Sequence, residues 1–135
     1  MPKLCDEGET LVGEVFLKGD AQPAFWLGLY KDDPEPAENA TVAGLTEAQT
    51  PGVNGYNRIA LADGDWTESP QGIFTNLQKT FTASGGDWGS VYGYFITTAE
   101  TGTAGKLVSV EHFDDGPYPM NDGFITKVTP KMTVS

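Results

Sequence analysis

Helical periodicity is almost missing from this chain of 135 residues, and that feature limits its fold more than any other. No window of a dozen residues convincingly places apolar side chains at positions i, i+3, i+4 and i+7, as an amphipathic helix requires. The nearest candidate, residues 41–49, contains Gly44 and runs into Pro51, so we expect one helical turn there at most. Seventeen glycines and nine prolines supply frequent turns between the apolar segments. The pattern predicts an all-β protein.

Short apolar segments of strand length recur between these turns. The expected strands cover residues 11–18, 24–30, 56–61, 73–83, 88–98, 106–113 and 124–129. Two long connections, residues 32–55 and 114–123, are rich in proline, glycine and aspartate. We expect a single domain over residues 1–135, folded as an antiparallel β-sandwich or jelly-roll-like barrel with long loops. Residues 1–10 are expected to form an extended N-terminal arm.

The charge of the chain excludes several classes of partner. Nineteen acidic and eight basic side chains give a formal net charge of −11, which argues against binding to nucleic acid or to anionic lipid. The acidic residues gather in the predicted loops and chain ends. No apolar run is long enough to span a membrane, and the acidic N-terminus does not resemble a secretory signal. We therefore expect a protein made in a reducing cytoplasm, with no role at nucleic acid or membrane.

The sequence offers no convincing set of catalytic, cofactor-binding or metal-binding residues. His112 is the only histidine and lies within a predicted strand. No serine occurs in a sharp glycine-flanked turn, so the sequence offers no nucleophile for which His112 could act as general base. Cys5 is the only cysteine, so neither a disulfide within the chain nor a cysteine zinc cluster can form. Acidic pairs such as Asp63 and Asp65 read more readily as solvated turn residues than as calcium ligands. We predict that the protein is not an enzyme and needs no cofactor.

Several short motifs follow one another in a fixed order. An aromatic-containing apolar strand is followed by a proline-rich loop, a Tyr-x-Arg strand, a tryptophan-bearing turn and strand, and a hairpin before a Lys-Leu strand. In this sequence these motifs are Leu27–Tyr30, Gly55–Arg58, Trp66, Phe81–Ala83, Asp87–Val91, Tyr94–Ile96, Thr101–Gly102 and Gly105–Leu107. This ordered set resembles a family of tailed-bacteriophage virion proteins that is described as tail-fibre-like and is encoded among head and tail morphogenesis genes. The resemblance, over roughly residues 24–113, implies a structural virion protein without enzymatic activity. The longer hairpin at residues 101–105 and the loop at residues 114–123 depart from the family pattern.

The expected function is adhesive. We expect a capsid cement or decoration protein that binds neighbouring capsid subunits, with the major capsid protein as partner. It would be present as a homo-oligomer or in many copies, in a virion assembled in the host cytoplasm. A tail, tail-fibre or baseplate component is the alternative within the same class. A carbohydrate-binding module that uses tryptophans, among Trp26, Trp66 and Trp88, and a calcium ion is the alternative from another class. The residues predicted to contact a partner are Phe16, Trp26, Tyr118 and Met120.

Overall fold

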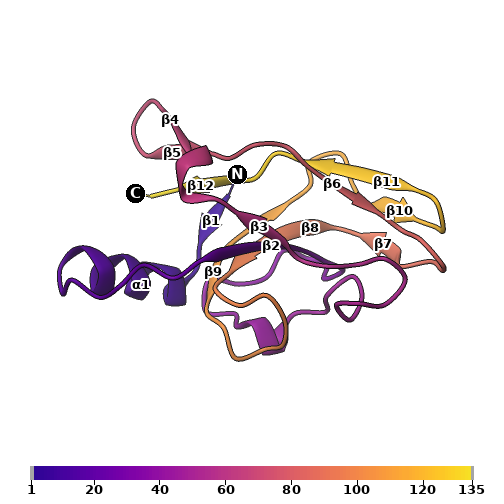
Figure 1. The fold of residues 1–135 in the computed structure, drawn as a ribbon, viewed down its shortest axis with the longest axis horizontal. Helices are drawn as coiled ribbons and strands as arrows, with labels where there is room; N and C mark the ends of the chain where they lie inside the picture. Colours follow the sequence, from indigo (N-terminus) through magenta and orange to yellow (C-terminus); the bar gives the residue numbers. More distant parts are fainter. Residues whose placement is uncertain (1, 135) are drawn as a thin grey trace.

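The computed structural model describes residues 2–134 as strands and long loops, with one α-helix (Figure 1). Every strand pairing in this part of the chain is antiparallel, which confirms the all-β prediction. The strands form four hydrogen-bonded sheets, of five, three, two and two strands. A sandwich or jelly-roll topology and the single-domain assignment stay predictions.

The five-stranded sheet is the centre of the molecule. Its strands, in spatial order, are β1 (Lys3–Leu4), β9 (Leu107–His112), β8 (Gly93–Thr97), β2 (Phe25–Tyr30) and β3 (Ile59–Leu61). The predicted connection between residues 98 and 106 joins β8 to β9, as expected for a hairpin. Every residue of β8 is buried, because both faces of this strand are covered.

The other strands form three small sheets. They are β7 (Gly89–Val91) with β10 (Tyr118–Met120), β6 (Lys79–Thr82) with β11 (Ile125–Val128), and β5 (Ile73–Thr75) between β4 (Thr67–Ser69) and β12 (Lys131–Thr133). Two short 3₁₀ turns, η1 (Val42–Gly44) and η2 (Asp63–Asp65), lie in the connections. The η1 turn confirms that residues 41–49 hold one helical turn at most.

Two apolar clusters lie on opposite faces of the five-stranded sheet. The larger joins Leu27 and Leu29 of β2 to Trp88 and to side chains of the small sheets. In it the Tyr56 and Trp88 rings meet edge to face, with centroids 5.2 Å apart. The smaller cluster contains Tyr30 and Phe95 and lies under the long connection between β2 and β3. Leu27 and Leu29 thus face one cluster and Tyr30 faces the other, which explains why residues 24–30 are apolar on both faces.

Residues 6–16 are helical, so the prediction of a strand over residues 11–18 was wrong. Within the predicted arm over residues 1–10, Lys3–Leu4 form a strand of the sheet, the chain is helical from Asp6 onward, and residue 1 lies outside the described residues. Helix α1 spans Asp6–Phe16 and follows directly after β1. Gly8, Leu11, Val12, Val15 and Phe16 follow the spacing i, i+3, i+4, i+7, i+8. Two valines and two glycines hid this pattern, since both residue types disfavour helix. Three acidic residues in the first turn offset that cost through the helix dipole.

Other strand boundaries also differ from the predictions. The predicted strand over residues 56–61 begins only at Ile59, and the predicted strand over residues 88–98 divides into β7 and β8, which lie in different sheets. The predicted strand over residues 73–83 is interrupted at Asn76, whose buried side chain donates to the Ala62 carbonyl and whose backbone N–H donates to Pro130. It therefore forms β5 and β6, in different sheets. The predicted loop over residues 114–123 contains β10, and β12, for which no strand was predicted, pairs with β5.

Candidate interaction surfaces

An apolar hollow of about 380 Å³ lies between α1 and the ends of several strands. Helix α1 provides one wall, and the opposite wall comes from β2, β5, β9, β12 and the chain around η2. The side chains that line it are mainly large and apolar, among them Leu11, Val15, Phe25, Trp66, Phe74 and Met132. The hollow is open to solvent, so the exposed residues of α1 form its rim.

The first turn of α1 is fixed to the body of the molecule by close contacts. A Cβ atom built on Gly8 would overlap the backbone carbonyl oxygen of Val108, so the helix approaches β9 only because residue 8 has no side chain. The Leu107 backbone N–H donates to the Glu7 carboxylate at 2.9 Å. These contacts position α1 against the edge of the sheet.

The last turn of α1 projects away from the body. Phe16 and Leu17 are 83% and 80% exposed, and Val12 on the same helix is also exposed. Figure 1 shows the helix extending beyond the sheets at one end of the long axis. Gly19, with φ of +76°, lets the chain reverse after the helix. We call Val12, Phe16 and Leu17, with the hollow beside them, the α1 surface.

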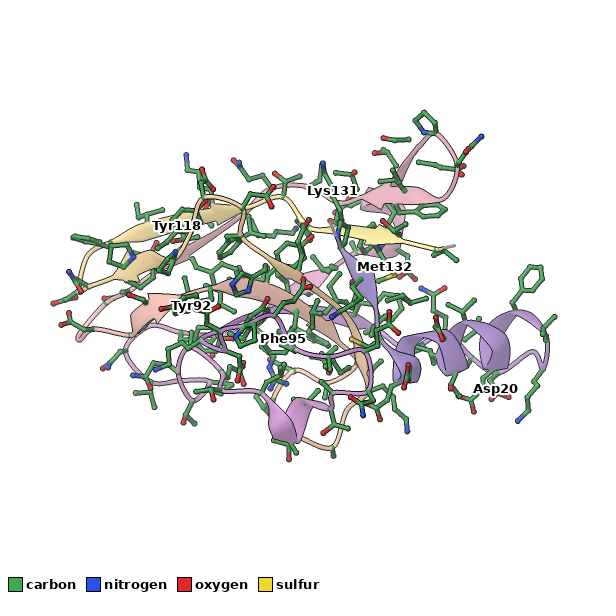
Figure 2. The ribbon with its side chains drawn as sticks, turned by 180° about the vertical axis from the view of Figure 1, so that it is seen from behind. Asp20, Tyr92, Phe95, Tyr118, Lys131 and Met132 are labelled. Carbon is green, nitrogen blue, oxygen red and sulfur yellow. The ribbon has the colours of Figure 1, made fainter. Side chains whose placement is uncertain are left out.

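A second apolar surface lies on β10 and β11. Tyr118, Pro119, Phe124, Ile125 and Lys127 line a shared shallow hollow, and we call these residues the β11 surface. Ile125 is 57% exposed and Phe124 is 45% exposed. In the β6–β11 pairing Ile125 lies opposite Thr82, and both residues are exposed. Figure 2 shows Tyr118 and Asp20, which follows α1, toward opposite ends of the molecule.

The structure separates the four residues predicted to contact a partner. Phe16 is on the α1 surface and Tyr118, half-buried, is on the β11 surface, where its hydroxyl donates to Asp115. Trp26 is half-buried in β2. Met120 is fully buried in the larger apolar cluster, where the Thr126 hydroxyl contacts its sulfur, so a partner cannot reach it without rearrangement. Partner binding by these residues stays a prediction.

Four residues of these surfaces were not predicted from the sequence: Val12, Leu17, Phe124 and Ile125. The helical spacing from Gly8 onward could have indicated Val12, whereas Leu17 is outside that spacing and directly follows the helix. For Ile125, the alternation along 125–128 places Thr126 and Val128 inward and Ile125 outward. An isoleucine on the solvent face of an edge strand is a signal for an interface.

Comparison with known protein families identifies the chain. The family model described as "Podophage GP4 fiber I protein gp80" matches residues 9–123. The chain belongs to this family. The match extends beyond the region that carried the resemblance in the sequence, and it confirms a tail-fibre-like structural protein of a tailed phage. As a member of this fibre family the chain is a virion component. No curated protein matches the chain significantly.

The long connection between β2 and β3 in this family member is fastened by a buried ion pair. The Arg58 guanidinium binds both carboxylate oxygens of Glu47, at 2.8 and 2.9 Å, and its side chain is 1% exposed. It also donates to the Ala99 and Gly102 carbonyls in the β8–β9 turn, at 2.9 and 2.8 Å. The Tyr56 hydroxyl donates to Glu47 at 2.5 Å. These hydrogen bonds join the β2–β3 connection of the fibre-family protein to its β8–β9 turn.

The one histidine belongs to a second polar cluster, on the same face of the sheet as the smaller apolar cluster. The Tyr30 hydroxyl and His112 Nδ1 are 3.0 Å apart, and His112 Nε2 is 3.5 Å from Asp33. The His112 backbone N–H donates to Glu35. Burial, followed by the surrounding carboxylates, raises the pKa of Tyr30 well above its ordinary value, which keeps the phenol protonated. These contacts hold residues 33–35 against β9.

The thiol of Cys5 is expected to be unreactive. Burial raises its pKa to about 12, so almost none of it is the nucleophilic thiolate near neutral pH. Among residues 2–134, no group of three histidine, cysteine or acidic side chains is arranged to hold a metal ion. In the same range no helix is long and apolar enough to cross a membrane.

The three tryptophans do not form a common exposed platform for stacking on a sugar. Trp88 is buried and its indole N–H donates to the Asn54 carbonyl, whereas Trp26 and Trp66 are half-buried. Trp66 lines the hollow beside α1. The most exposed side chains of the two surfaces in this fibre-family chain, such as Phe16, Leu17 and Ile125, are therefore aliphatic or phenyl groups.

Proposed function

We propose that this chain is a structural component of a phage tail-fibre apparatus and attaches to another virion protein through the α1 surface. The main support for this proposal is the exposed end of α1, where two adjacent large apolar side chains are exposed to solvent beside an apolar hollow. The family description, a fibre protein, supports the fibre location.

The α1 surface has the composition of the centre of an interface. Phe16 and Leu17 are almost free of contacts, so nearly all of their apolar area is available to a partner. Burying such a side chain contributes about 1.5–3 kcal/mol. Two of them in one patch correspond to a change in affinity of at least about 100-fold. Because both side chains are outside the core, replacing them leaves the fold intact.

The test is incorporation of a variant into particles. A phage carrying Phe16→Asp with Leu17→Asp is compared with one carrying Val53→Asp, an apolar-to-acid change at a residue that is 42% exposed and lies on neither surface. We expect the double variant to be depleted from purified virions and the control to be retained. Equal incorporation of both variants, with unchanged circular dichroism, would overturn the proposal.

Imaging of the wild-type particle decides between the two virion locations. Density for the chain on the tail fibres is the expected result. Density on the head, next to the major capsid protein, would instead support the cement role and the partner predicted from the sequence. The variant experiment is independent of this location, since it tests only whether the α1 surface makes the attachment.

A further inference from the structure

A second hollow, of about 310 Å³, is lined by residues from the end of β9, from β10 and β11, and from the start of β12. Its volume is within the range of about 300–1,000 Å³ that is usual for binding sites of small molecules. Unlike the hollow beside α1, it combines aromatic rings with charged groups: Phe113, Tyr118, Glu111, Asp114, Lys127 and Lys131. We call it the Phe113 hollow. It borders the β11 surface, with which it shares Tyr118 and Lys127.

Aromatic rings form part of the wall of the Phe113 hollow. The rings of Phe113 and Tyr118 have centroids 4.8 Å apart, and both residues are half-buried. The hydroxyl of Tyr118 donates to Asp115. The ring of Tyr94, which is buried, lies 6.3 Å from that of Phe113, and its hydroxyl donates to Glu111 at 2.6 Å. These hydrogen bonds fix the rings before any ligand binds, and the uncovered part of the two half-buried rings is apolar area for packing.

Charged groups of both signs line the hollow together with these rings. Asp114, Lys127 and Lys131 are exposed, and among residues 2–134 their side chains form no hydrogen bond or ion pair. The carboxylates of Glu111 and Asp115 also line the hollow, and each accepts a tyrosine hydroxyl. Three carboxylates therefore stand against two ammonium groups, so the formal charge of the acidic and basic side chains is close to balanced.

The chemistry of a ligand follows from this lining. An ion of either sign would meet like charges as well as opposite ones, and ion pairs between exposed groups contribute little. A wholly apolar ligand would cover charged groups without replacing their hydrogen bonds to water. A hydroxyl group both donates and accepts, so it can satisfy a carboxylate and an ammonium group at the same time. A ring with hydroxyls on its edge and C–H groups on its faces meets both requirements.

We propose that the Phe113 hollow binds an uncharged saccharide. One face of the sugar ring packs against Phe113 and Tyr118. Its hydroxyls donate to the Asp114 carboxylate and accept from the ammonium groups of Lys127 and Lys131. Helix α1 lies toward the opposite end of the long axis from β10 (Figure 1), so a copy attached through the α1 surface keeps this hollow free. The inference goes beyond the proposed function and does not rest on it.

The experiment is a titration of the isotope-labelled protein with glucose, galactose and N-acetylglucosamine, followed by NMR. Glucuronate, glucosamine and free glycine are the anionic, cationic and zwitterionic comparisons. Tyr118→Ala removes part of the aromatic wall, and Lys127→Met with Lys131→Met removes both ammonium groups but keeps the apolar stems. Tyr118→Phe, which keeps the ring, and Lys18→Met, at an exposed lysine beyond α1, are the matched controls. Because both lysines of the hollow are exposed, the lysine variant tests the inference even if Tyr118→Ala fails to fold.

We expect at least one of the three neutral sugars to shift the backbone signals of residues 111–118 and 127–131 saturably, and those of α1 not at all. Tyr118→Ala and the double lysine variant should each weaken this binding at least about 10-fold, whereas both controls should bind as the wild type does. The inference is overturned if no neutral sugar binds there, if a charged probe or glycine binds more tightly than the neutral sugars, or if the lysine variant binds as tightly as the wild type. The Phe16→Asp and Leu17→Asp double variant should bind the sugar normally, so failure of this inference and failure of the proposed function are distinguishable.

Discussion

Replacing Arg58 by methionine tests whether the buried ion pair fastens the long β2–β3 connection. The change removes every guanidinium contact but keeps most of the side-chain volume, so no large cavity is created. Glu47, whose side chain is only 17% exposed, would lose its bidentate partner. Removing one partner of a buried pair costs about 3–5 kcal/mol, because the other charge is left uncompensated.

This loss is a large part of the total stability, which is about 5–15 kcal/mol for a typical domain. An unfolding entropy of about 2.1 cal/mol/K per residue gives about 0.28 kcal/mol/K for 135 residues. The expected fall in Tm is then about 10–18 °C. Differential scanning calorimetry measures it, with Lys18→Met, a cation-to-methionine change at an exposed residue, as the control.

A double-mutant cycle decides whether the pair is the cause. Glu47→Leu together with Arg58→Met removes both charges, and it should be more stable than Arg58→Met alone, because the uncompensated carboxylate is gone. The reasoning is refuted if Arg58→Met costs less than about 1 kcal/mol, as a solvent-exposed pair would, or if the two single effects simply add.

Two further predictions concern helix packing and alkaline pH. Gly8→Ala should lower the free energy of unfolding by about 1–3 kcal/mol, because the added Cβ overlaps the β9 backbone. Gly13→Ala has open space around its Cβ and should raise the free energy of unfolding by about 0.5–1 kcal/mol. Denaturant titration measures both changes, and equal effects of the two variants would contradict the close approach of α1 to β9. Stability should also fall steeply above pH 10, by about 1.4 kcal/mol per pH unit for each buried tyrosine whose pKa is raised by burial, since unfolding there releases protons that the folded chain retains. The tyrosinate absorbance of three of the five tyrosines should rise only together with loss of circular dichroism. Because Tyr92 and Tyr118 are half-buried, a rise in the folded protein that corresponds to more than two tyrosines would contradict the burial of the other three.

Much of the sheet could be predicted because its strands satisfy one simple pattern. The segments that became β2, β8 and β9 are apolar, rich in β-branched and aromatic residues, and bounded by turn residues. Their side chains are buried on both faces or alternate cleanly, so local preference and tertiary packing agree. The Tyr-x-Arg motif was predicted to begin a strand over residues 56–61, but only Ile59–Leu61 are paired, as β3. The role of Arg58 was not predicted, because its partner Glu47 comes from a loop eleven residues earlier.

The rest depended on contacts that a linear pattern does not contain. Helix α1 has weak intrinsic preference, with two glycines and two valines, and its stability comes from packing against β9. Met120 appeared to be in an exposed loop, yet β10 pairs with β7 and turns it into the core. The hollow of the α1 surface arises from the three-dimensional proximity of α1 to β12, which lie near opposite ends of the sequence. The strands β10 and β11 are consecutive, but which of their side chains face solvent depends on pairing with β7 and β6.

The two ends of α1 differ in how tightly they are packed, and this difference affects how the protein can evolve. Its first turn is tied to the sheet at Gly8 and Glu7, whereas Phe16 and Leu17 touch little else in their own chain. Mutations of Phe16 and Leu17 can therefore alter what the helix recognises with almost no effect on folding. Mutations of Gly8 and Glu7 destabilise the fold and are removed by selection. A lineage, or a protein engineer, can exchange the tip to acquire a new attachment point on an unchanged scaffold.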